Sequence, residues 1–402
     1  MHLIVVTSII LAVSYAEENV EQLDDNGLAT SDQCKGDNAF VLDGCYPKLE
    51  CFPNVSPWKT LTRPVPKPDD PSEIDVGLVL YTLRNIENGT ELILCPQLNV
   101  EETDFSPTKP TFLVVHGLGG NNLTGYLHEI KDSLLQNVDA NVIVVSYSSG
   151  SFLKYLQVVS NLRIVAAVLA RAVKQLIDLG LRPKNIHAIG HSLGAHVCAY
   201  LGKIISSDNH KIGVITALDP AQPAFEAEDA AVKLTENDAD TVIVIHTNGK
   251  PFFPFLGFGY VNPGGTIDIF VNGGKNQPDC KPSINPSEKR VTSMAALATM
   301  SVGSLIDMAA IGCSHGKSVK YYVSALENKD YLCVARKISD FKTFANKVNL
   351  QNLARIDDQI FSRENSICTK EDCSILGLLT SELPARGNFD LKTQSEYPYC
   401  SE

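Results

Sequence analysis

The sequence predicts an α/β protein with a mostly parallel central sheet and helices on both faces. Apolar, β-branched runs of strand length alternate with stretches of helical periodicity, a pattern that is typical of parallel strands joined by crossover helices. The chain has 402 residues, of which 44% are hydrophobic and 20% are charged. It is therefore long enough to bury a large core.

The expected strands are short and nearly continuously apolar, as buried strands are. Apolar residues at helical spacing predict a helix over 158–180, which ends at Gly180 with Pro183 just beyond. A second helix is expected over Ala195–Lys203. The expected strands cover residues 76–84, 90–95, 111–117, 141–148, 186–189, 211–220 and 240–249.

A serine lies between the strand at 186–189 and the helix that follows it, in Gly190-His191-Ser192-Leu193-Gly194. Small residues are required beside such a sharp turn because side chains there would collide with the strand and the helix. The pattern is typical of a nucleophile elbow, in which the serine Oγ is exposed and the helix N-terminus faces developing negative charge. The bare pattern occurs by chance in roughly one chain in ten of this length, so the flanking strand and helix indicate the function.

A serine nucleophile needs an acid and a base, which follow in the order Ser, Asp, His on an α/β-hydrolase sheet. Asp219 ends the next expected strand, and carboxyl ends of neighbouring strands meet at one crevice. Because Asp219 precedes Pro220, it could instead simply open a turn.

Two histidines lie downstream of Asp219. His315 is expected on a loop between Cys313 and a helix, where it could reach a site held by a rigid sheet. His246 lies near the end of an apolar strand, where a histidine is more often a hydrogen-bonded structural residue. Position favours His315 as the base without excluding His246.

The N-terminus predicts secretion. Residues 1–16 are an apolar run with small residues near its end, which indicates a signal peptide. A transmembrane anchor is the alternative, but the run is short and acidic residues follow at once. Residues 17–40 are expected to be a disordered acidic segment, and residues 41–402 the catalytic domain.

Other features bear on compartment and partners. Eleven cysteines fit an oxidising compartment. The net charge of −12 argues against nucleic-acid partners and against electrostatic capture by anionic lipid, and no further run suggests an integral membrane anchor. N-glycosylation sequons begin at Asn54, Asn88 and Asn122.

The chain resembles the pancreatic lipase family of secreted α/β-hydrolases, from about Cys45 to His315. The motifs that carry the resemblance are CYPKLECFPNVSPW, HGLGG, SNLRIV, IHAIGHSLGAH, LDPAQPAF, VIVIHTNG, LGFGYVNPGGTIDIFVNGG and a cysteine just before the histidine.

The resemblance implies a role for each candidate residue. Ser192 is the nucleophile, Asp219 the acid and His315 the base, while His246 is structural. The backbone N–H groups of Leu118 and Leu193 form the oxyanion hole.

The resemblance also implies a lid over residues 281–312, bracketed by Cys280 and Cys313. Three of the four methionines lie in this segment, and methionine suits irregular apolar surfaces such as lipid. One more amphipathic core helix is the alternative. Replacing three apolar residues of the segment with serine should reduce activity on emulsified triglyceride and spare soluble esters. These residues are Met294, Leu297, Met300, Leu305 and Met308.

The expected function is triacylglycerol hydrolysis at lipid–water interfaces. The alternative within enzymes is a phospholipase A1, although a full-length lid favours neutral glycerides. An alternative of another class is a lipid-binding or yolk-type storage protein on a lipase fold, which the intact Ser192, Asp219 and His315 argue against.

Two departures from the family pattern affect cofactors and partners. The family's calcium loop falls near Ala230–Asp238, where Ala230 and Thr235 replace two carboxylates, so no metal or other cofactor is expected. Only 76 residues follow Leu326, too few for the colipase-binding β-sandwich domain, so colipase is not expected as a partner.

The resemblance implies disulfides Cys45–Cys51, Cys280–Cys313 and Cys368–Cys373, and Cys198 is expected to be a buried free thiol. Cys34–Cys95 with Cys333–Cys400 is a guess for the remaining four.

Overall fold

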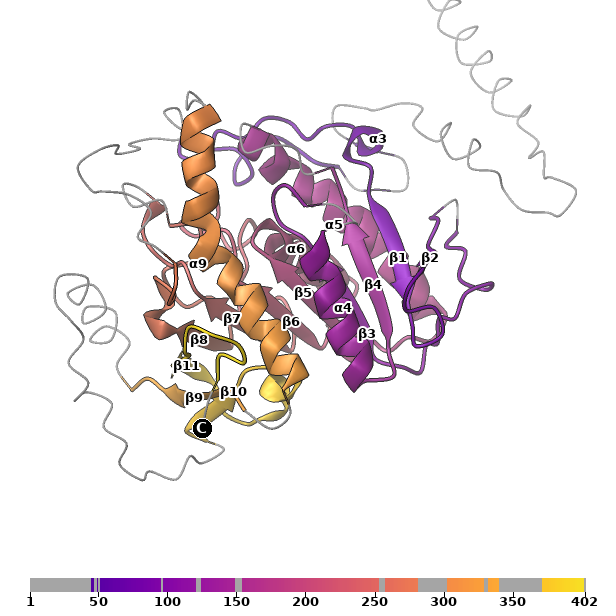
Figure 1. The fold of residues 1–402 in the computed structure, drawn as a ribbon. Helices are drawn as coiled ribbons and strands as arrows, with labels where there is room; N and C mark the ends of the chain where they lie inside the picture. Colours follow the sequence, from indigo (N-terminus) through magenta and orange to yellow (C-terminus); the bar gives the residue numbers. More distant parts are fainter. Residues whose placement is uncertain are drawn as a thin grey trace, which may run out of the picture.

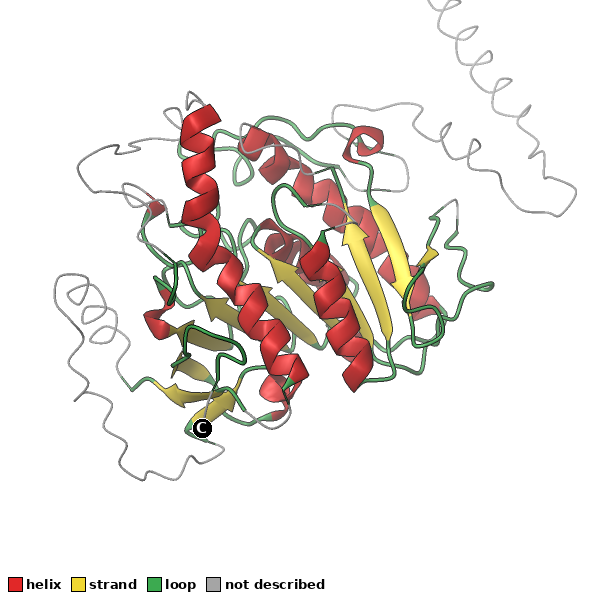
Figure 2. Cartoon of the chain, viewed as in Figure 1, coloured by secondary structure: helices red, strands yellow, loops and turns green. Residues whose placement is uncertain are grey.

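The computed structural model describes residues 45–46, 49, 51–94, 97–120, 124–148, 154–252, 257–280, 302–328, 332–339 and 371–400, and for 302–311 the backbone alone. Its strands form one sheet with helices packed on it (Figures 1 and 2).

The strands are β1 (Gly77–Tyr81), β2 (Thr90–Glu91), β3 (Thr111–Val115), β4 (Asn141–Ser146), β5 (Ile186–His191), β6 (Val214–Leu218), β7 (Thr241–His246), β8 (Ile267–Val271), β9 (Val334–Lys337), β10 (Cys373–Ile375) and β11 (Gly387–Leu391). The helices are α3 (Pro71–Ile74), α4 (Gly125–Asn137), α5 (Tyr155–Asp178), α6 (Leu193–Ser207) and α9 (Val302–Glu327), with 3-10 turns η3 (Pro183–Asn185), η4 (Asn272–Gly274) and η7 (Leu378–Glu382).

The strand order is β10-β9-β11-β8-β7-β6-β5-β3-β4-β1-β2. Neighbouring strands from β11 to β4 in this order run parallel, and the pairs beyond both ends are antiparallel. The prediction of a mostly parallel sheet is confirmed.

Helices cover both faces of the sheet, as predicted. Leu113 and Val115 of β3 join the core cluster that contains α5 and α6, whereas Phe112 and Val114 join the cluster that contains α4 and the C-terminal half of α9. Figure 1 shows α4 and α9 in front of the sheet, with α5 and α6 behind it. Because both faces are covered, β3 is buried at every position rather than at alternate ones.

Most of the expected strands are present, although several are shorter than predicted. The expected strand at 90–95 is reduced to Thr90–Glu91. No strand was predicted for β8, β9, β10 or β11. The strands at the β10 edge of the sheet are short. Only one of the four residues of β9 is buried, so this strand lacks the continuous apolar run of a central strand.

The helix expected over 158–180 is α5, Tyr155–Asp178. Among the described residues, it alone is long and apolar enough to cross a membrane. However, 78% of its most apolar stretch is buried inside the fold, as in the core helix of a globular domain.

His315 does not lie on a loop, as predicted, but inside α9. Gly312 and Gly316 lie inside this helix, although glycine is disfavoured in helices by about 1 kcal/mol. A Cβ at either position would meet nothing within 4 Å, so the glycines do not mark a turn, and tertiary packing outweighs their propensity. Residues 281–301 of the expected lid lie outside the described residues, and 302–312 form the first turns of α9.

Cysteine pairing agrees with the expectations wherever it is described. The disulfides Cys45–Cys51, Cys280–Cys313 and Cys333–Cys400 are formed. Cys373 is also disulfide-bonded, and Cys34, Cys95 and Cys368 lie outside the described residues. Cys198 is a buried free thiol, and burial raises its pKa.

Candidate active site

Ser192 occupies the turn between β5 and α6 in a strained backbone conformation. Its φ of 56° and ψ of −116° lie outside the regions that ordinary residues populate, at a cost of about 1–3 kcal/mol that the surroundings must offset. Its N–H donates to Leu218 O at 3.0 Å, and its carbonyl accepts from Ala195 N and Ala221 N, both at 3.2 Å. The turn is thus fastened to the end of β6.

The glycines on either side of Ser192 are required by close backbone approach. A Cβ on Gly190 would lie 2.4 Å from Gly194 O, and a Cβ on Gly194 would lie 2.4 Å from Val115 O. The expectation that this turn tolerates only the smallest residues is confirmed.

Asp219 is fully buried at the end of β6, and both of its carboxylate oxygens are hydrogen-bonded. Oδ1 accepts from the N–H groups of Thr247 at 2.8 Å and Asn248 at 3.0 Å, and Oδ2 lies 2.6 Å from His315 Nδ1. Gly259 passes so close that a Cβ there would lie 2.2 Å from Oδ1. The side chain therefore does more than open a turn.

His315 projects from α9 toward the ends of β5 and β6. Because its Nδ1 lies against a carboxylate, Nδ1 carries the proton and donates it, which leaves the Nε2 lone pair available as a base. The ring lies 4.7 Å from that of His191 and 5.7 Å from that of Phe258. Among the described residues, no hydrogen bond joins His315 to Ser192 Oγ, and such bonds often form only when substrate binds.

Two further histidines near the site are neutral. Burial lowers the pKa of His116 to about 4. Burial, reinforced by the proximity of His315, lowers the pKa of His191 well below its ordinary value. No positive charge on these rings therefore opposes an imidazolium at His315, which Asp219 would stabilise.

The candidate oxyanion donors lie on either side of Ser192. Leu193 is the first residue of α6, and the leading N–H groups of a helix have no partner within it. Leu118 follows Gly117, whose Cβ, if present, would lie 2.9 Å from Ser192 Cβ. The chain after β3 thus passes directly beside the serine.

His246, at the end of β7, is fully buried and does not bond to Ser192 or Asp219. Its ring bonds to Asp268 Oδ1 at 2.8 Å and to Tyr260 O at 3.0 Å. The structure thus brings His315, and not His246, to the carboxylate of Asp219.

Two residues that lie against Asp219 and His315 were not identified from the sequence. Gly259 and Phe258 lie in a recognised motif, but neither was assigned a role. Their signal was a glycine-rich stretch, which indicates close backbone approach.

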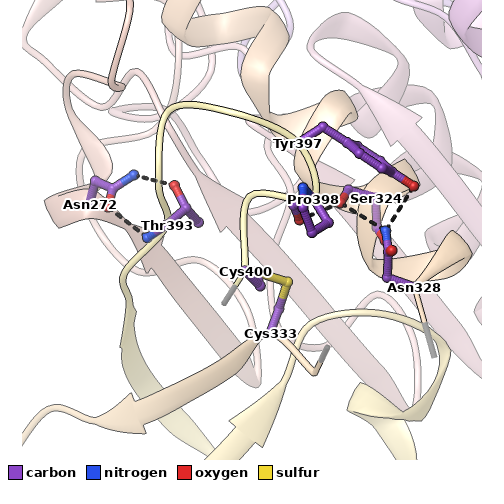
Figure 3. Close-up of a disulfide and its surroundings, with 8 residues drawn as sticks. All are labelled: Asn272, Ser324, Asn328, Cys333, Thr393, Tyr397, Pro398 and Cys400. Carbon is purple, nitrogen blue, oxygen red and sulfur yellow. Dashed lines mark hydrogen bonds between the residues drawn. A yellow bond between two sulfur atoms is a disulfide. The ribbon is translucent and has the colours of Figure 1, made fainter. Parts of the chain in front are cut away.

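The helix that carries His315 is fastened by the C-terminal strap, residues 392–400. Ser324 Oγ donates to Pro398 O at 2.6 Å, and Asn328 Nδ2 donates to Tyr397 Oη at 2.9 Å (Figure 3). The Cys333–Cys400 disulfide closes the strap at one end, and two hydrogen bonds between Asn272 and Thr393 hold the other.

Asp238, which lies where the resemblance places the family's calcium loop, already has hydrogen-bond partners within the chain. Asp238 accepts hydrogen bonds from the backbone and hydroxyl of Thr235 and from the ammonium group of Lys203 on α6. A Cβ on Gly202 would lie 2.0 Å from Asp238 O, so the backbone of α6 is in close contact with this segment. A metal ion beside Asp238 would have to displace Lys203, and the described residues contain no cluster of three or more metal-ligating acidic, histidine or cysteine side chains.

A parallel sheet with a strained serine after one strand and an aspartate after the next, joined to a histidine on a later helix, defines an α/β-hydrolase. Comparison with known proteins narrows the class, because the profile of the Lipase family matches residues 43–399. The chain belongs to the lipase family.

Similar curated proteins include mammalian lipases. Pancreatic lipase-related protein 2 of Myocastor coypus is 36% identical over 71% of this chain and 59% of its own length. Pancreatic triacylglycerol lipases of Myocastor coypus and Homo sapiens are each 35% identical over 71% of this chain, and over 60% and 59% of their own lengths. The chain therefore spans about three-fifths of these relatives.

Among solved structures, the phospholipase/carboxylesterase from Dyadobacter fermentans aligns with 44% of this chain and 75% of its own at 14% identity and a TM-score of 0.31. That likeness is too partial to bear on function.

Proposed function

We propose that the protein is a secreted carboxylic-ester hydrolase that cleaves acylglycerols at lipid–water interfaces. The observation that carries the proposal is the buried hydrogen bond between His315 Nδ1 and Asp219 Oδ2, at the strand ends beside the strained Ser192. Membership of the lipase family and the names of the similar triacylglycerol lipases support the substrate class. The disulfides support an oxidising compartment.

In this proposal Ser192 is the nucleophile. His315 Nε2 takes the proton from Ser192 Oγ as the oxygen attacks the ester carbonyl carbon, and the carbonyl oxygen becomes an alkoxide. The C–O bond to the alcohol then breaks, and His315 gives its proton to the leaving oxygen. Water, deprotonated by the same Nε2, then attacks the acyl carbon, the bond from that carbon to Ser192 Oγ breaks, and His315 returns the proton to Oγ as the fatty acid leaves.

Asp219 and two backbone N–H groups would stabilise the charges that form. Asp219 fixes the His315 tautomer and offsets the imidazolium charge. The N–H groups of Leu118 and Leu193 would donate to the alkoxide, each contributing about 3 kcal/mol. The net charge of −12 gives no long-range attraction to anionic lipid, so interfacial binding would depend on apolar contacts.

Assays of the purified mature protein on triolein and on phosphatidylcholine, each with position-labelled acyl chains, test the substrate class. Fatty-acid release from triolein at a rate well above that from phosphatidylcholine is the expected result. Preferential release of the sn-1 chain of phosphatidylcholine would establish phospholipase A1 activity instead. Binding of both lipids with no release from either would favour a lipid-binding protein.

We also propose that the enzyme needs no calcium, because Lys203 supplies the positive charge beside Asp238. A chelator should leave the melting temperature and the ester hydrolysis rate unchanged. Lys203→Met should lower the free energy of unfolding by about 1–3 kcal/mol, because it leaves a buried carboxylate unpaired. Thermal unfolding with and without chelator measures both effects.

Lys174→Met is the matched control, since Lys174 pairs with Asp208 at an exposed site, where an ion pair contributes little to stability. A melting temperature that falls on chelation and recovers with calcium would contradict the proposal.

A further inference from the structure

The fully buried ring of His246 lies between two hydrogen-bond acceptors. Its Nδ1 is 3.0 Å from the carbonyl oxygen of Tyr260, and its Nε2 is 2.8 Å from Asp268 Oδ1. A neutral imidazole has one N–H and can satisfy only one of these partners. The ring can donate to both only if it carries two protons and a positive charge.

The surroundings of Asp268 favour this charged form. Asp268 Oδ1 also accepts from Gly264 N at 2.9 Å, and Oδ2 accepts from Gly265 N at 3.1 Å. Since both oxygens act as acceptors, the carboxylate is the form that fits. The Phe270 ring stacks on His246 with centroids 4.1 Å apart and offers its π-face to a cation.

The contacts of His246 and Asp268 lie next to the backbone groups that bind Asp219. The next two residues after His246 are Thr247 and Asn248, whose N–H groups bind Asp219 Oδ1. Tyr260, Gly264 and Gly265, which bond to the pair, belong to the described segment 257–265.

The same segment carries Gly259, which presses on the Asp219 carboxylate. It is also tied to Asn248, whose Oδ1 accepts from Phe258 N at 2.8 Å. The histidine–aspartate pair thus connects both backbone segments that enclose the catalytic acid.

Resting on the function proposed above, we propose that His246 is a positioning residue, which Asp268 holds as a buried imidazolium and which fixes the carboxylate of Asp219 for catalysis. Loss of one ring proton would break the bond to Tyr260 or the bond to Asp268. Either loss would loosen one of the two segments against Asp219.

The charged groups around His246 set the direction of the pH dependence. Asp268 on β8 and Asp219 after β6 both favour the cation. The phenol of Tyr260 stays neutral because burial raises its pKa well above the ordinary value. Lys250 interacts electrostatically with Asp219, and His315 is hydrogen-bonded to the same carboxylate.

Burial lowers the pKa of His246, but the hydrogen bonds to Asp268 and to the Tyr260 carbonyl and the charges of Asp268 and Asp219 together raise it above its ordinary value. A raised pKa means that the pair's contribution to stability is complete below about pH 6.5 and is lost as pH rises through the folded-state pKa.

The first test uses nitrogen NMR of the wild-type protein labelled at its nine histidines. One solvent-protected ring should retain both N–H protons at about pH 7.5, where ordinary histidines are neutral. Absence of any doubly protonated ring at that pH would overturn the proposal.

The second test compares Asp268→Asn with His187→Gln on a soluble ester, p-nitrophenyl butyrate. Asp268→Asn removes the negative charge that stabilises the His246 imidazolium. The carboxylate of Asp219 should then be slightly misplaced, so kcat should fall roughly 10–100-fold. KM should change little, and the dependence of the melting temperature on pH above neutrality should flatten. A folded Asp268→Asn protein with wild-type kcat would overturn the positioning role.

His187→Gln is the control because, like Asp268→Asn, it removes one partner of a buried side-chain hydrogen bond that involves a histidine, here the bond between His187 and Thr216. Burial lowers the pKa of His187 to about 3, so its ring is already neutral. This variant should lose stability but keep the wild-type kcat and pH profile.

If Asp268→Asn does not fold, the wild-type enzyme still decides the question. Its kcat should decline over the same pH interval in which NMR shows His246 losing its proton, and a constant kcat across that interval would overturn the proposal. Complete absence of ester hydrolysis in the wild type would instead contradict the proposed function, while the NMR result would stand by itself.

Discussion

Replacement of Ser192 by alanine should abolish hydrolysis of every ester that the protein cleaves. Without Oγ no acyl-enzyme can form, and loss of a triad nucleophile lowers kcat by about 10⁴–10⁶-fold. The fold should persist, because Ser192 Oγ makes no hydrogen bond among the described residues and alanine adds no atom to the tight turn. Initial rates on triolein and p-nitrophenyl butyrate measure the loss, and thermal unfolding measures the stability.

Ser206→Ala is the matched control, since Ser206 is an exposed residue of the same helix, α6. It should retain wild-type rates. If Ser192→Ala kept wild-type activity on both substrates, the assignment of the nucleophile would be wrong.

Removal of the base should have an effect of similar size. His315→Ala leaves Ser192 with no group to accept its proton, and Asp219→Asn favours the wrong histidine tautomer, so each should lower kcat by about 10⁴-fold or more. The effects should not add, because the residues act as a unit. Single-turnover measurements on p-nitrophenyl butyrate with the two single variants and the double variant check this.

His210→Ala is the control for the histidine, because His210 is exposed and follows α6. It should behave as wild type. A double variant whose loss equals the product of the single losses would mean that His315 and Asp219 act independently, contrary to their hydrogen bond.

The elements that could be predicted from the sequence are those whose own residues determine their structure. Strands such as β3 and β7 are buried on both faces, so their continuous apolar runs identify them. Ser192 and Asp219 could be related from sequence alone, because they end consecutive parallel strands and parallel strands end at the same edge.

The helical setting of His315 could not be predicted, because it depends on the packing of α9 rather than on its two glycines. Its bond to Asp219 joins residues 96 positions apart, and only order along the chain and family resemblance pointed to it. The strap contacts made by Asn272, Ser324 and Asn328 involve polar side chains without periodicity, so no sequence pattern marks them.

The roles of His246 and Asp268 show a different limit. The sequence indicated a structural histidine at the end of a strand, but the charge of that histidine depends on which atoms face its two nitrogens. One of those atoms is the backbone carbonyl oxygen of Tyr260. Every residue has a backbone carbonyl, so the residue types do not show which one faces the histidine.

The contacts of the C-terminal strap can form only late in the synthesis of the chain. α9 leaves the ribosome well before Thr393, Pro398 and Cys400, so a nascent chain carries His315 on a helix whose contacts with the strap have not yet formed. Parallel strand β11, which pairs with β8, also arrives late. The domain therefore cannot complete its site from the N-terminus onward as synthesis proceeds, and esterase activity should be absent from ribosome-bound chains that stop short of the strap.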